Sequence, residues 1–228
     1  MCYSTTLDME LKDLERAMDR RMLAGSRTRQ LHIDDDRSIL FKRVSAFSRP
    51  FWPVVSNDRP DVIQMFRWGF FKKDIAAEDE AAEWIKRWPS FNAISEEVEG
   101  KATYKEAWAK GQRCIIPVTT FTEWMHVPVE GKKTPLKVPY NIRINEPITL
   151  LGGLWQDTLL GYRIYTVLTT QSNSLMTTIH NSKKRQPVII PADMVQFWFS
   201  PTLPLDRIKQ LCDPVHERDM LAQEVQAA

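Results

Sequence analysis

Cys2 is the residue of this chain whose position allows the most unusual chemistry. It follows Met1 directly, and methionine aminopeptidases remove an initiator methionine when the next residue is as small as cysteine. Removal of Met1 would leave a free α-amine and a thiol on one residue. We expect both to be partly nucleophilic at neutral pH, because an α-amine titrates near about 8 and a free thiol near about 8.5. On this dipeptide alone, an inert cysteine beside the start codon is the simpler interpretation.

A vicinal amine and thiol react with aldehydes in a way that an internal cysteine cannot. The amine condenses with the aldehyde to a Schiff base, and the sulfur then adds to the same carbon and closes a five-membered thiazolidine ring. The rest of the chain has to supply the acid–base groups that this chemistry needs.

Three further residues could serve in acid–base or polar roles. Glu123 alternates with large apolar residues in a segment typical of an inner strand, and burial there would raise its pKa towards the range useful for catalysis. His180 stands before the basic run Lys183-Lys184-Arg185, a suitable place for a proton shuttle beside an anionic ligand. Asn92 is the third candidate. Each also has a plain structural explanation, namely a paired carboxylate, a structural histidine and a turn asparagine.

Other kinds of site find little support in the sequence. The four histidines are widely scattered, and none pairs with a cysteine at the spacing of a zinc site. Gly152-Gly153 is not followed by the Lys-Ser/Thr of a phosphate-binding loop, and no G-x-S-x-G nucleophile elbow is present. We therefore expect no metal ion and no cofactor.

The composition is that of a soluble globular protein, with 228 residues, 43% hydrophobic and 26% charged, and a formal net charge of +2. This small charge argues against a strongly basic nucleic-acid coat but allows a local basic groove. The three cysteines form no CxxC pair or disulfide framework, and no apolar run is long enough to span a membrane. These features predict a cytoplasmic protein that does not bind membranes.

The periodicity of the chain predicts one α+β domain, residues 1–228, with a strand-rich middle. Apolar residues from Leu7 to Met22 recur at helical spacing, with Gly25 as the expected stop of this helix, and residues 76–88 are also helical in character. Gly152-Gly153 is expected to form a tight turn or bulge, and the polar tail from Pro214 to be loosely held. Strands rich in β-branched and aromatic residues are predicted at 113–118, 121–125, 140–144, 148–151 and 162–169.

The run from Ser45 to Val55 contains two prolines and three aromatic residues, and it is too broken for a helix. Two interpretations stay open from the sequence. The run is either a rigid loop wedged over the core or an apolar lip beside a site.

Five short motifs occur in order between residues 1 and 200. They are Cys2 behind the initiator Met, the pair Trp68-Gly69, Asn92-Ala93 with Glu96, a strand Arg113-Cys114-x-x-Pro117 running into Phe121-x-Glu123-Trp124, and His180 followed by Arg185-x-Pro187-Val188-Ile189. This series resembles the SOS response-associated peptidase (SRAP) family of abasic-site-processing proteins. The resemblance implies the SRAP fold, a barrel-like mixed β core flanked by helices.

The resemblance also implies a role for each chemical candidate. SRAP proteins bind single-stranded DNA, and their N-terminal cysteine crosslinks to the ring-opened aldehyde of an abasic site through a thiazolidine. Carried over, Cys2 is the nucleophile and Glu123 is the acid–base group near the Schiff base. Asn92 orients the amine or the sugar, and His180 assists opening of the deoxyribose and proton transfer. Autopeptidase removal of Met1 and DNA lyase activity by β-elimination are implied as well.

Two departures from the family pattern concern DNA binding. Family members usually carry Asn-Ala-Arg, but Ile94 stands where that phosphate-binding arginine would be. The common His-x-Arg-Met-Pro is stretched to His180-Asn181-Ser182-Lys183-Lys184-Arg185-Gln186-Pro187. The basic residues of this stretched segment could replace the lost contact.

Single-stranded DNA requires cations for its phosphates and flat faces for its bases. Trp52 and Trp68 are predicted to stack on bases. The predicted phosphate contacts are Arg67, Lys72, Lys73, Lys183, Lys184 and Arg185. We expect the protein to act on this DNA as a monomer.

Two alternatives remain open from the sequence. One is a cysteine-dependent hydrolase of peptides, in which Cys2, His180 and Glu123 are nucleophile, base and acid. The other is a DNA-binding module without catalysis, in which Cys2 is inert.

Overall fold

Most of the chain folds around a ring of β-strands. The structure, a computed structural model, describes residues 2–23 and 43–225. Its larger sheet has the strand order β12-β11-β10-β7-β4-β5-β2, with β6 beside β11. The bounds are β2 (Arg21–Met22), β4 (Phe51–Ser56), β5 (Arg59–Trp68), β6 (Asn92–Ile94), β7 (Arg113–Val118), β10 (Thr149–Asp157), β11 (Arg163–Gln171) and β12 (Arg185–Pro187).

The ring closes where β11 meets β5. These strands pair in parallel, with Ile164 opposite Arg67 and Tyr165 opposite Trp68. The strands β5, β4, β7, β10 and β11 therefore form a closed circuit, while the other pairings around it are antiparallel. The expected barrel-like mixed β core is confirmed.

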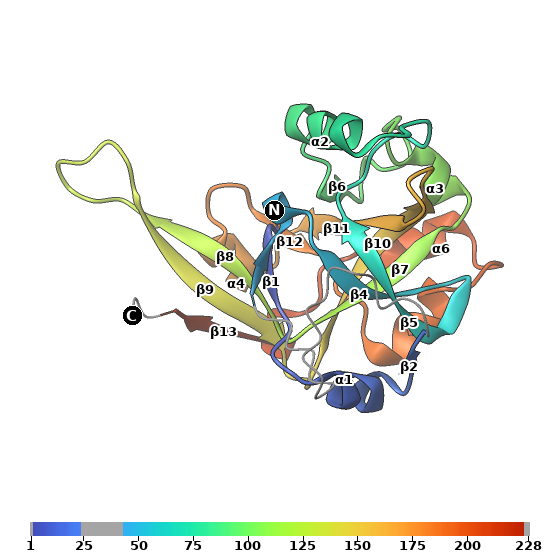
Figure 1. Ribbon diagram of the computed structural model, residues 1–228. Helices are drawn as coiled ribbons and strands as arrows, with labels where there is room; N and C mark the ends of the chain where they lie inside the picture. Colours follow the sequence, from blue (N-terminus) through green and yellow to red (C-terminus); the bar gives the residue numbers. More distant parts are fainter. Residues whose placement is uncertain (1, 24–42, 226–228) are drawn as a thin grey trace.

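A second sheet extends from the barrel, with the strand order β13-β9-β8-β1-β3. Its bounds are β1 (Ser4–Thr6), β3 (Val44–Ser45), β8 (Thr120–Val127), β9 (Leu136–Ile144) and β13 (Met220–Glu224). The β8–β9 hairpin projects well beyond the barrel (Figure 1). Because β8 follows β7 after one residue, Thr119, the barrel and the second sheet share a continuous stretch of chain.

Gly152 and Gly153 lie inside β10, so the prediction of a turn or bulge is wrong. A Cβ on Gly153 would lie 2.5 Å from the carbonyl oxygen of Thr166 and 2.7 Å from a side-chain carbon of Ile116. The glycine therefore serves close packing between β10 and β11 rather than a change of chain direction.

The predicted helix at 76–88 is confirmed as α2 (Glu78–Arg87), but the first helix is shorter than predicted. It ends at Met18 because Asp19 adopts the left-handed conformation, with φ of 49°, and Arg21–Met22 then joins β5 as β2. The predicted stop, Gly25, lies outside the described residues. The helices are α1 (Leu11–Met18), α2, α3 (Lys105–Ala109), α4 (Ser174–Ile179), α5 (Val195–Trp198) and α6 (Leu205–Gln210), with 3-10 turns η1 (Ala46–Ser48), η2 (Ala192–Met194) and η3 (Glu217–Asp219).

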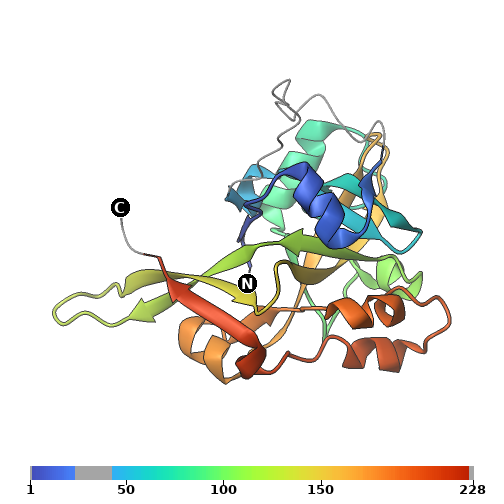
Figure 2. The ribbon, with the colours of Figure 1, turned by 90° about the horizontal axis from the view of Figure 1, so that it is seen from below.

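The tail after Pro214 is more ordered than its polar composition suggested. Its residues Met220–Glu224 form β13, which pairs with β9 over five positions from Met220↔Ile144 to Glu224↔Tyr140. Figure 2 shows this strand lying along the hairpin. Backbone pairing with an open strand edge, together with burial of Met220 and packing of Val215 and Ala222 against the core, thus holds the described part of the tail.

In the described ranges, 2–23 and 43–225, no helix is both long and apolar enough to cross a membrane.

Candidate active site

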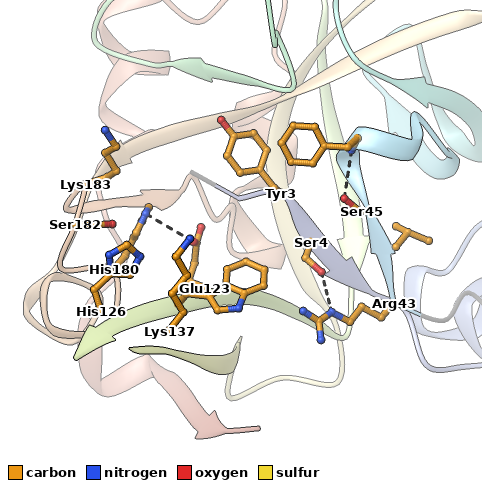
Figure 3. A pocket seen from close by; sticks show the side chains of 13 residues that line it. Tyr3, Ser4, Arg43, Ser45, Glu123, His126, Lys137, His180, Ser182 and Lys183 are labelled. Atoms are coloured by element: carbon orange, nitrogen blue, oxygen red, sulfur yellow. Dashed lines mark hydrogen bonds and ion pairs between the residues drawn. The ribbon is translucent and has the colours of Figure 1, made fainter. Parts of the chain in front are cut away.

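A pocket of about 690 Å³ lies where β1, β3 and β8 meet the loop after α4 (Figure 3). Its described lining combines a buried carboxylate and imidazole with exposed cations and aromatic rings. The lining residues are Tyr3, Ser4, Arg43, Val44, Ser45, Phe47, Glu123, Trp124, His126, Lys137, His180, Ser182 and Lys183.

Glu123 and His180 face each other at the inner end of this pocket. Glu123 comes from β8 and His180 caps the C-terminus of α4, and their Oε2 and Nε2 atoms are 3.7 Å apart. The glutamate side chain is only 3% exposed. Because burial disfavours the carboxylate, the pKa of Glu123 is raised to about 7. At neutral pH this residue can therefore both give and take a proton.

The imidazole of His180 has a defined tautomer. Its Nδ1 lies 2.8 Å from the carbonyl oxygen of Arg185, and a carbonyl can only accept, so Nδ1 carries the proton. The lone pair of Nε2 is then directed towards Glu123. Burial lowers the pKa of His180 to about 4, so the ring is neutral at physiological pH.

Cys2 lies beside this pair, at the start of β1. The antiparallel register of β1 and β8 matches Thr5 with Phe121 and Thr6 with Thr120. Extended by two residues, the same register brings Tyr3 level with Glu123. The Cys2 thiol is fully buried, and its pKa is raised first by burial and then by the charge of Glu123. The expectation of a partly ionised thiol at neutral pH is wrong, because that value belongs to an exposed cysteine.

The outer part of the pocket is basic. Arg43, Lys137 and Lys183 are all exposed and come from the segment before β3, from β9 and from the loop after α4. Arg43 donates from Nε to the Ser4 hydroxyl at 3.0 Å and lies over the Trp124 ring at 5.7 Å. Because three chain segments contribute cations to one rim, the pocket suits an anionic ligand.

Asn92 is held on a different strand from the other candidates. It lies on β6, opposite Val167 of β11, and is only 9% exposed. Its backbone carbonyl accepts from the Tyr104 hydroxyl at 3.1 Å. Its side-chain amide makes no hydrogen bond within the described residues. Asn92 is not among the described residues that line the pocket.

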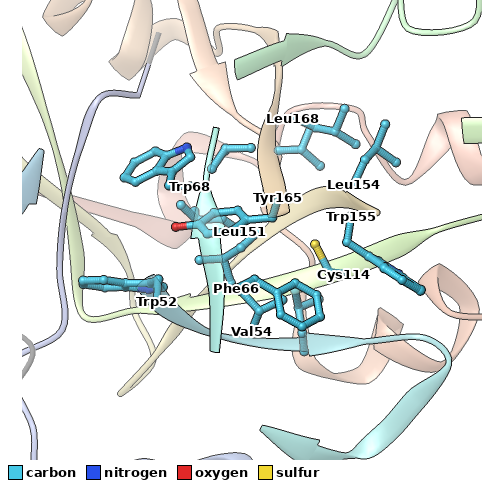
Figure 4. Packing of buried hydrophobic residues seen from close by; sticks show 14 of the residues in the cluster. Trp52, Val54, Phe66, Trp68, Cys114, Leu151, Leu154, Trp155, Tyr165 and Leu168 are labelled. Atoms are coloured by element: carbon cyan, nitrogen blue, oxygen red, sulfur yellow. The ribbon is translucent and has the colours of Figure 1, made fainter. Parts of the chain in front are cut away.

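Trp52 and Trp68 are core residues, so the prediction that they stack on DNA bases is wrong. Both are fully buried in the barrel, and Trp68 stacks on Tyr165 with ring centroids 5.7 Å apart (Figure 4). Their indole N–H groups donate to the carbonyl oxygens of Pro117 and Phe91. Neither ring offers a face to a ligand.

Most of the predicted phosphate contacts lie away from the pocket and already have partners. Arg67 pairs with Glu78 at 2.6 Å and Lys73 with Glu106 at 2.7 Å. Lys72 lies over the ring of Trp84, 5.0 Å from its centroid.

The stretched basic segment divides between two environments. Arg185 is bound by both carboxylate oxygens of Glu96, at 2.9 and 2.7 Å. Lys184 is exposed and has φ of 52°, which closes the turn before β12. Of the predicted phosphate contacts, Lys183 is the one that lines the described pocket.

Phe47 and Arg43 were not among the predicted site residues. Phe47 is 64% exposed at the pocket, and its ring lies 5.1 Å from Tyr3 and 5.3 Å from Phe91. Of the two sequence interpretations of the run from Ser45 to Val55, the apolar lip holds for Phe47, which lines the pocket. The rigid loop over the core is wrong, because residues from Phe51 onward form the buried strand β4. The mixed composition of that run was the available signal for Phe47.

Within the described residues, no group of three or more His, Cys, Asp or Glu side chains could hold a metal ion.

Comparison with known proteins decides the family. The family model described as SOS response associated peptidase (SRAP) matches residues 1–228. The chain belongs to the SRAP family. It is 31% identical over 179 residues to the abasic site processing protein YoaM of Bacillus subtilis, covering 75% of this chain and 72% of that protein. It is 30% identical to YoqW of the same organism, another abasic site processing protein, covering 75% and 73%.

Solved structures resemble the SRAP chain over almost its whole length. A protein from Bacteroides thetaiotaomicron superposes with a TM-score of 0.82 and 27% identity, covering 99% of this chain and 92% of that one. A protein from Bordetella bronchiseptica, at 21% identity, has the same fold with a TM-score of 0.74, covering 99% and 100%.

Proposed function

We propose that this protein binds single-stranded DNA at abasic sites and, after loss of Met1, crosslinks to the lesion through Cys2. The observation that carries the proposal is that Cys2 directly precedes Tyr3, which is level with Glu123, so that the buried thiol lies close enough to feel the Glu123 charge. Glu123 and His180 line a pocket with a basic rim, although Cys2 itself is not among its described lining residues. The relatives YoaM and YoqW, named as abasic site processing proteins, support the same substrate.

The proposed reaction forms two new bonds, one to nitrogen and one to sulfur, at the aldehyde carbon of the abasic site. The α-amine of Cys2 attacks the ring-opened aldehyde of the abasic site, and loss of one water gives a Schiff base. The thiol then adds across the C=N bond, with sulfur on carbon and the proton on nitrogen. The product is a thiazolidine, and the only molecule released is water.

The burial of the Cys2 thiol determines the order of these steps. Because its pKa is raised, the thiol is protonated at rest, and the amine reacts first. The sulfur then needs a base to take its proton. Glu123, with a pKa of about 7, is suited to protonate the carbinolamine hydroxyl, which leaves as water from a protonated Schiff base. Its carboxylate then accepts the thiol proton as sulfur bonds to carbon, so the net change is the addition of S–H across the C=N bond. The neutral His180 assists ring opening through Nε2, which can accept the proton of the sugar hydroxyl.

The outer pocket accounts for recognition of the DNA strand. Arg43, Lys137 and Lys183 pair with phosphates around the lesion. Phe47 takes the stacking role that was assigned to Trp52 and Trp68, because it is exposed beside the pocket. Asn92, held on β6 with an amide that has no hydrogen-bond partner among the described residues, is retained as a residue that orients the sugar.

Intact-mass measurement tests the proposal. The purified protein should lack Met1 and gain a mass adduct with a single-stranded oligonucleotide that contains an abasic site, but not with the undamaged oligonucleotide. Cys2→Ala is a sharp comparison, because alanine is also small enough for removal of Met1 and keeps the α-amine. This variant should give an adduct only after reduction of the Schiff base with borohydride.

Two outcomes would contradict the proposal. Retention of Met1 in the active protein would remove the amine on which the reaction depends. A stable adduct with Cys2→Ala in the absence of reductant would show that sulfur does not close the ring. Turnover of peptides without any DNA adduct would instead favour the cysteine hydrolase, and strand cleavage by β-elimination would show the predicted lyase activity.

A further inference from the structure

The segment that carries His180 into β12 forms a compact turn. The backbone N–H groups of Lys183 and Lys184 both donate to the carbonyl oxygen of His180, at 3.2 and 2.8 Å. The positive φ of Lys184 then turns the chain into β12. In this segment the sequence is longer than the common SRAP motif. The contacts described so far do not account for how the turn is held beside the pocket.

Asn181 ties this turn to β8. Its Oδ1 accepts from the backbone N–H of His126 at 3.1 Å, and its Nδ2 donates to the carbonyl oxygen of the same residue at 2.9 Å. One side-chain amide thus satisfies both peptide groups of one residue, as a neighbouring strand would. We call this pair of hydrogen bonds the Asn181 clasp.

The clasp connects the two elements that supply the proton-transfer pair. His126 lies three residues after Glu123 on β8, and Asn181 directly follows His180. On its other side, His180 is anchored through Nδ1 to the carbonyl oxygen of Arg185. The segment that carries the imidazole is therefore held from two directions, and Nε2 lies 3.7 Å from the Glu123 carboxylate.

We propose that Asn181 is a positioning residue, which holds His180 at the distance and angle from Glu123 that proton exchange requires during crosslinking. The inference rests on the proposed function, and it assigns a purpose to the stretched segment. Asn181 itself need not touch the DNA, since it acts through the backbone of its neighbours.

The groups around the imidazole stay the same when only the clasp is removed. The charged and titratable groups that face the pocket beside His180 come from several elements. They are Glu123 and His126 of β8, Lys183 of its own turn, Lys137 of β9, Arg43 before β3, Tyr3 before β1 and the N-terminal α-amine. Asn181→Ala changes none of their charges. Any change in the titration of His180 then reports a change in its position or burial.

Asn181→Ala should slow crosslinking to the abasic oligonucleotide by about 10-fold, because a displacement of about 1 Å at a reacting pair can cost up to about 100-fold. In the wild type, burial lowers the pKa of His180 to about 4. The variant admits water to the ring, so the NMR titration midpoint of His180 should move up towards the ordinary value of 6.5. Asn181→Asp can still accept from the His126 N–H but cannot donate to its carbonyl, so its crosslinking rate should fall between those of wild type and Asn181→Ala. The titration is compared only between wild type and Asn181→Ala, because the added carboxylate of Asn181→Asp would itself raise the pKa of His180.

Asn57→Ala is the matched control. The Asn57 side chain also makes two hydrogen bonds, accepting from the Arg113 backbone N–H and the Trp155 indole at 3.1 and 3.0 Å, on the other sheet. It should lower the melting temperature without moving the titration of His180.

Wild-type crosslinking rates in both Asn181 variants and an unmoved His180 midpoint in Asn181→Ala would overturn the inference. So would a shift of the midpoint in Asn57→Ala as large as that in Asn181→Ala. Failure of the wild type to crosslink would instead overturn the proposed function. The NMR titration needs no DNA, so it still tests the clasp in that case.

Discussion

The interior of the barrel and the floor of the pocket bury polar groups in different ways. In the barrel, the indole N–H groups of Trp52 and Trp68 donate to backbone carbonyl oxygens at 3.0 and 2.9 Å. On the pocket floor, the carboxylate of Glu123 and the imidazole of His180 face each other at 3.7 Å. Burial raises pKa values in both regions, but with different results. In the barrel it raises the pKa of the Cys114 thiol and the Tyr165 phenol, which keeps both neutral at physiological pH, whereas on the pocket floor it brings the pKa of Glu123 to about 7.

This difference separates structural burial from functional burial. A buried donor that is hydrogen-bonded to a carbonyl contributes to stability. A buried carboxyl group with its pKa raised to about 7, such as Glu123, lowers the stability of the fold at neutral pH, but it can exchange protons there. Displaced pKa values beside an open pocket are typical of catalytic sites. Substitutions in the two regions should therefore change stability with opposite signs.

Glu123→Gln is expected to have the largest effect. Loss of the acid–base group should slow crosslinking by roughly 10²- to 10⁴-fold. Folding of the wild type takes up a proton between pH 4.5 and about 7, so its stability falls as the pH rises through that window. Glutamine does not ionise, so the variant should gain up to about 3 kcal/mol relative to wild type above pH 7, since each pKa unit is worth about 1.4 kcal/mol. Urea unfolding at a series of pH values measures this.

Glu106→Gln is the control for that prediction. Glu106 is exposed, and its pKa is lowered to about 2 by hydrogen bonds from Lys110 and Lys73. It is therefore ionised in both the folded and unfolded states above about pH 6, and its variant should show no gain relative to wild type as the pH rises. An equal gain in both variants would mean that burial of Glu123 is not the cause.

Trp68→Ala tests the barrel side of the comparison. Removal of this fully buried ring should lower the free energy of unfolding by about 3–5 kcal/mol. Trp88→Ala removes the same side chain from a position that is 55% exposed, and its loss should stay within about 0.5 kcal/mol. Denaturant unfolding of both variants is the measurement. Similar losses of unfolding free energy in Trp68→Ala and Trp88→Ala would show that burial of Trp68 in the barrel is not what stabilises the fold.

Phe47→Ala should give the smallest effect, and one confined to binding. Because the ring is 64% exposed, stability should change by less than about 0.5 kcal/mol. Affinity for single-stranded DNA should fall by about 1–3 kcal/mol, the contribution of one stacked base. Leu159→Ala, at a position 67% exposed and outside the described pocket lining, should leave affinity unchanged in a fluorescence anisotropy titration. Equal affinities of the two variants would exclude Phe47 from the DNA site.

The strands of the middle of the chain were predictable because their pattern is local. The segment 113–118 coincides with β7, and the other predicted strands overlap β8 to β11 with changes at their ends. Local pattern failed where a distant partner decides the structure. Gly153 is needed by the backbone of Thr166, and the polar tail is ordered by pairing with β9.

The reactive groups of this protein could be identified from the amino-acid sequence alone. The sequence showed Cys2 behind a removable methionine, a carboxylate in a strand and a histidine before a basic run, and the order of these motifs indicated the family. Residue types and spacing are enough for this, because reactivity begins with the side chain itself.

Only the tertiary structure decided which of these groups meet and which are exposed. In the folded protein the Cys2 thiol and the two tryptophans predicted to stack on bases are buried, and Arg185 is paired with Glu96. Phe47 and Lys183 lie at the pocket. The physical reason is that burial, ion pairing and exposure depend on neighbours far away in the chain. One sequence position therefore does not reveal whether an aromatic ring faces the core or a ligand.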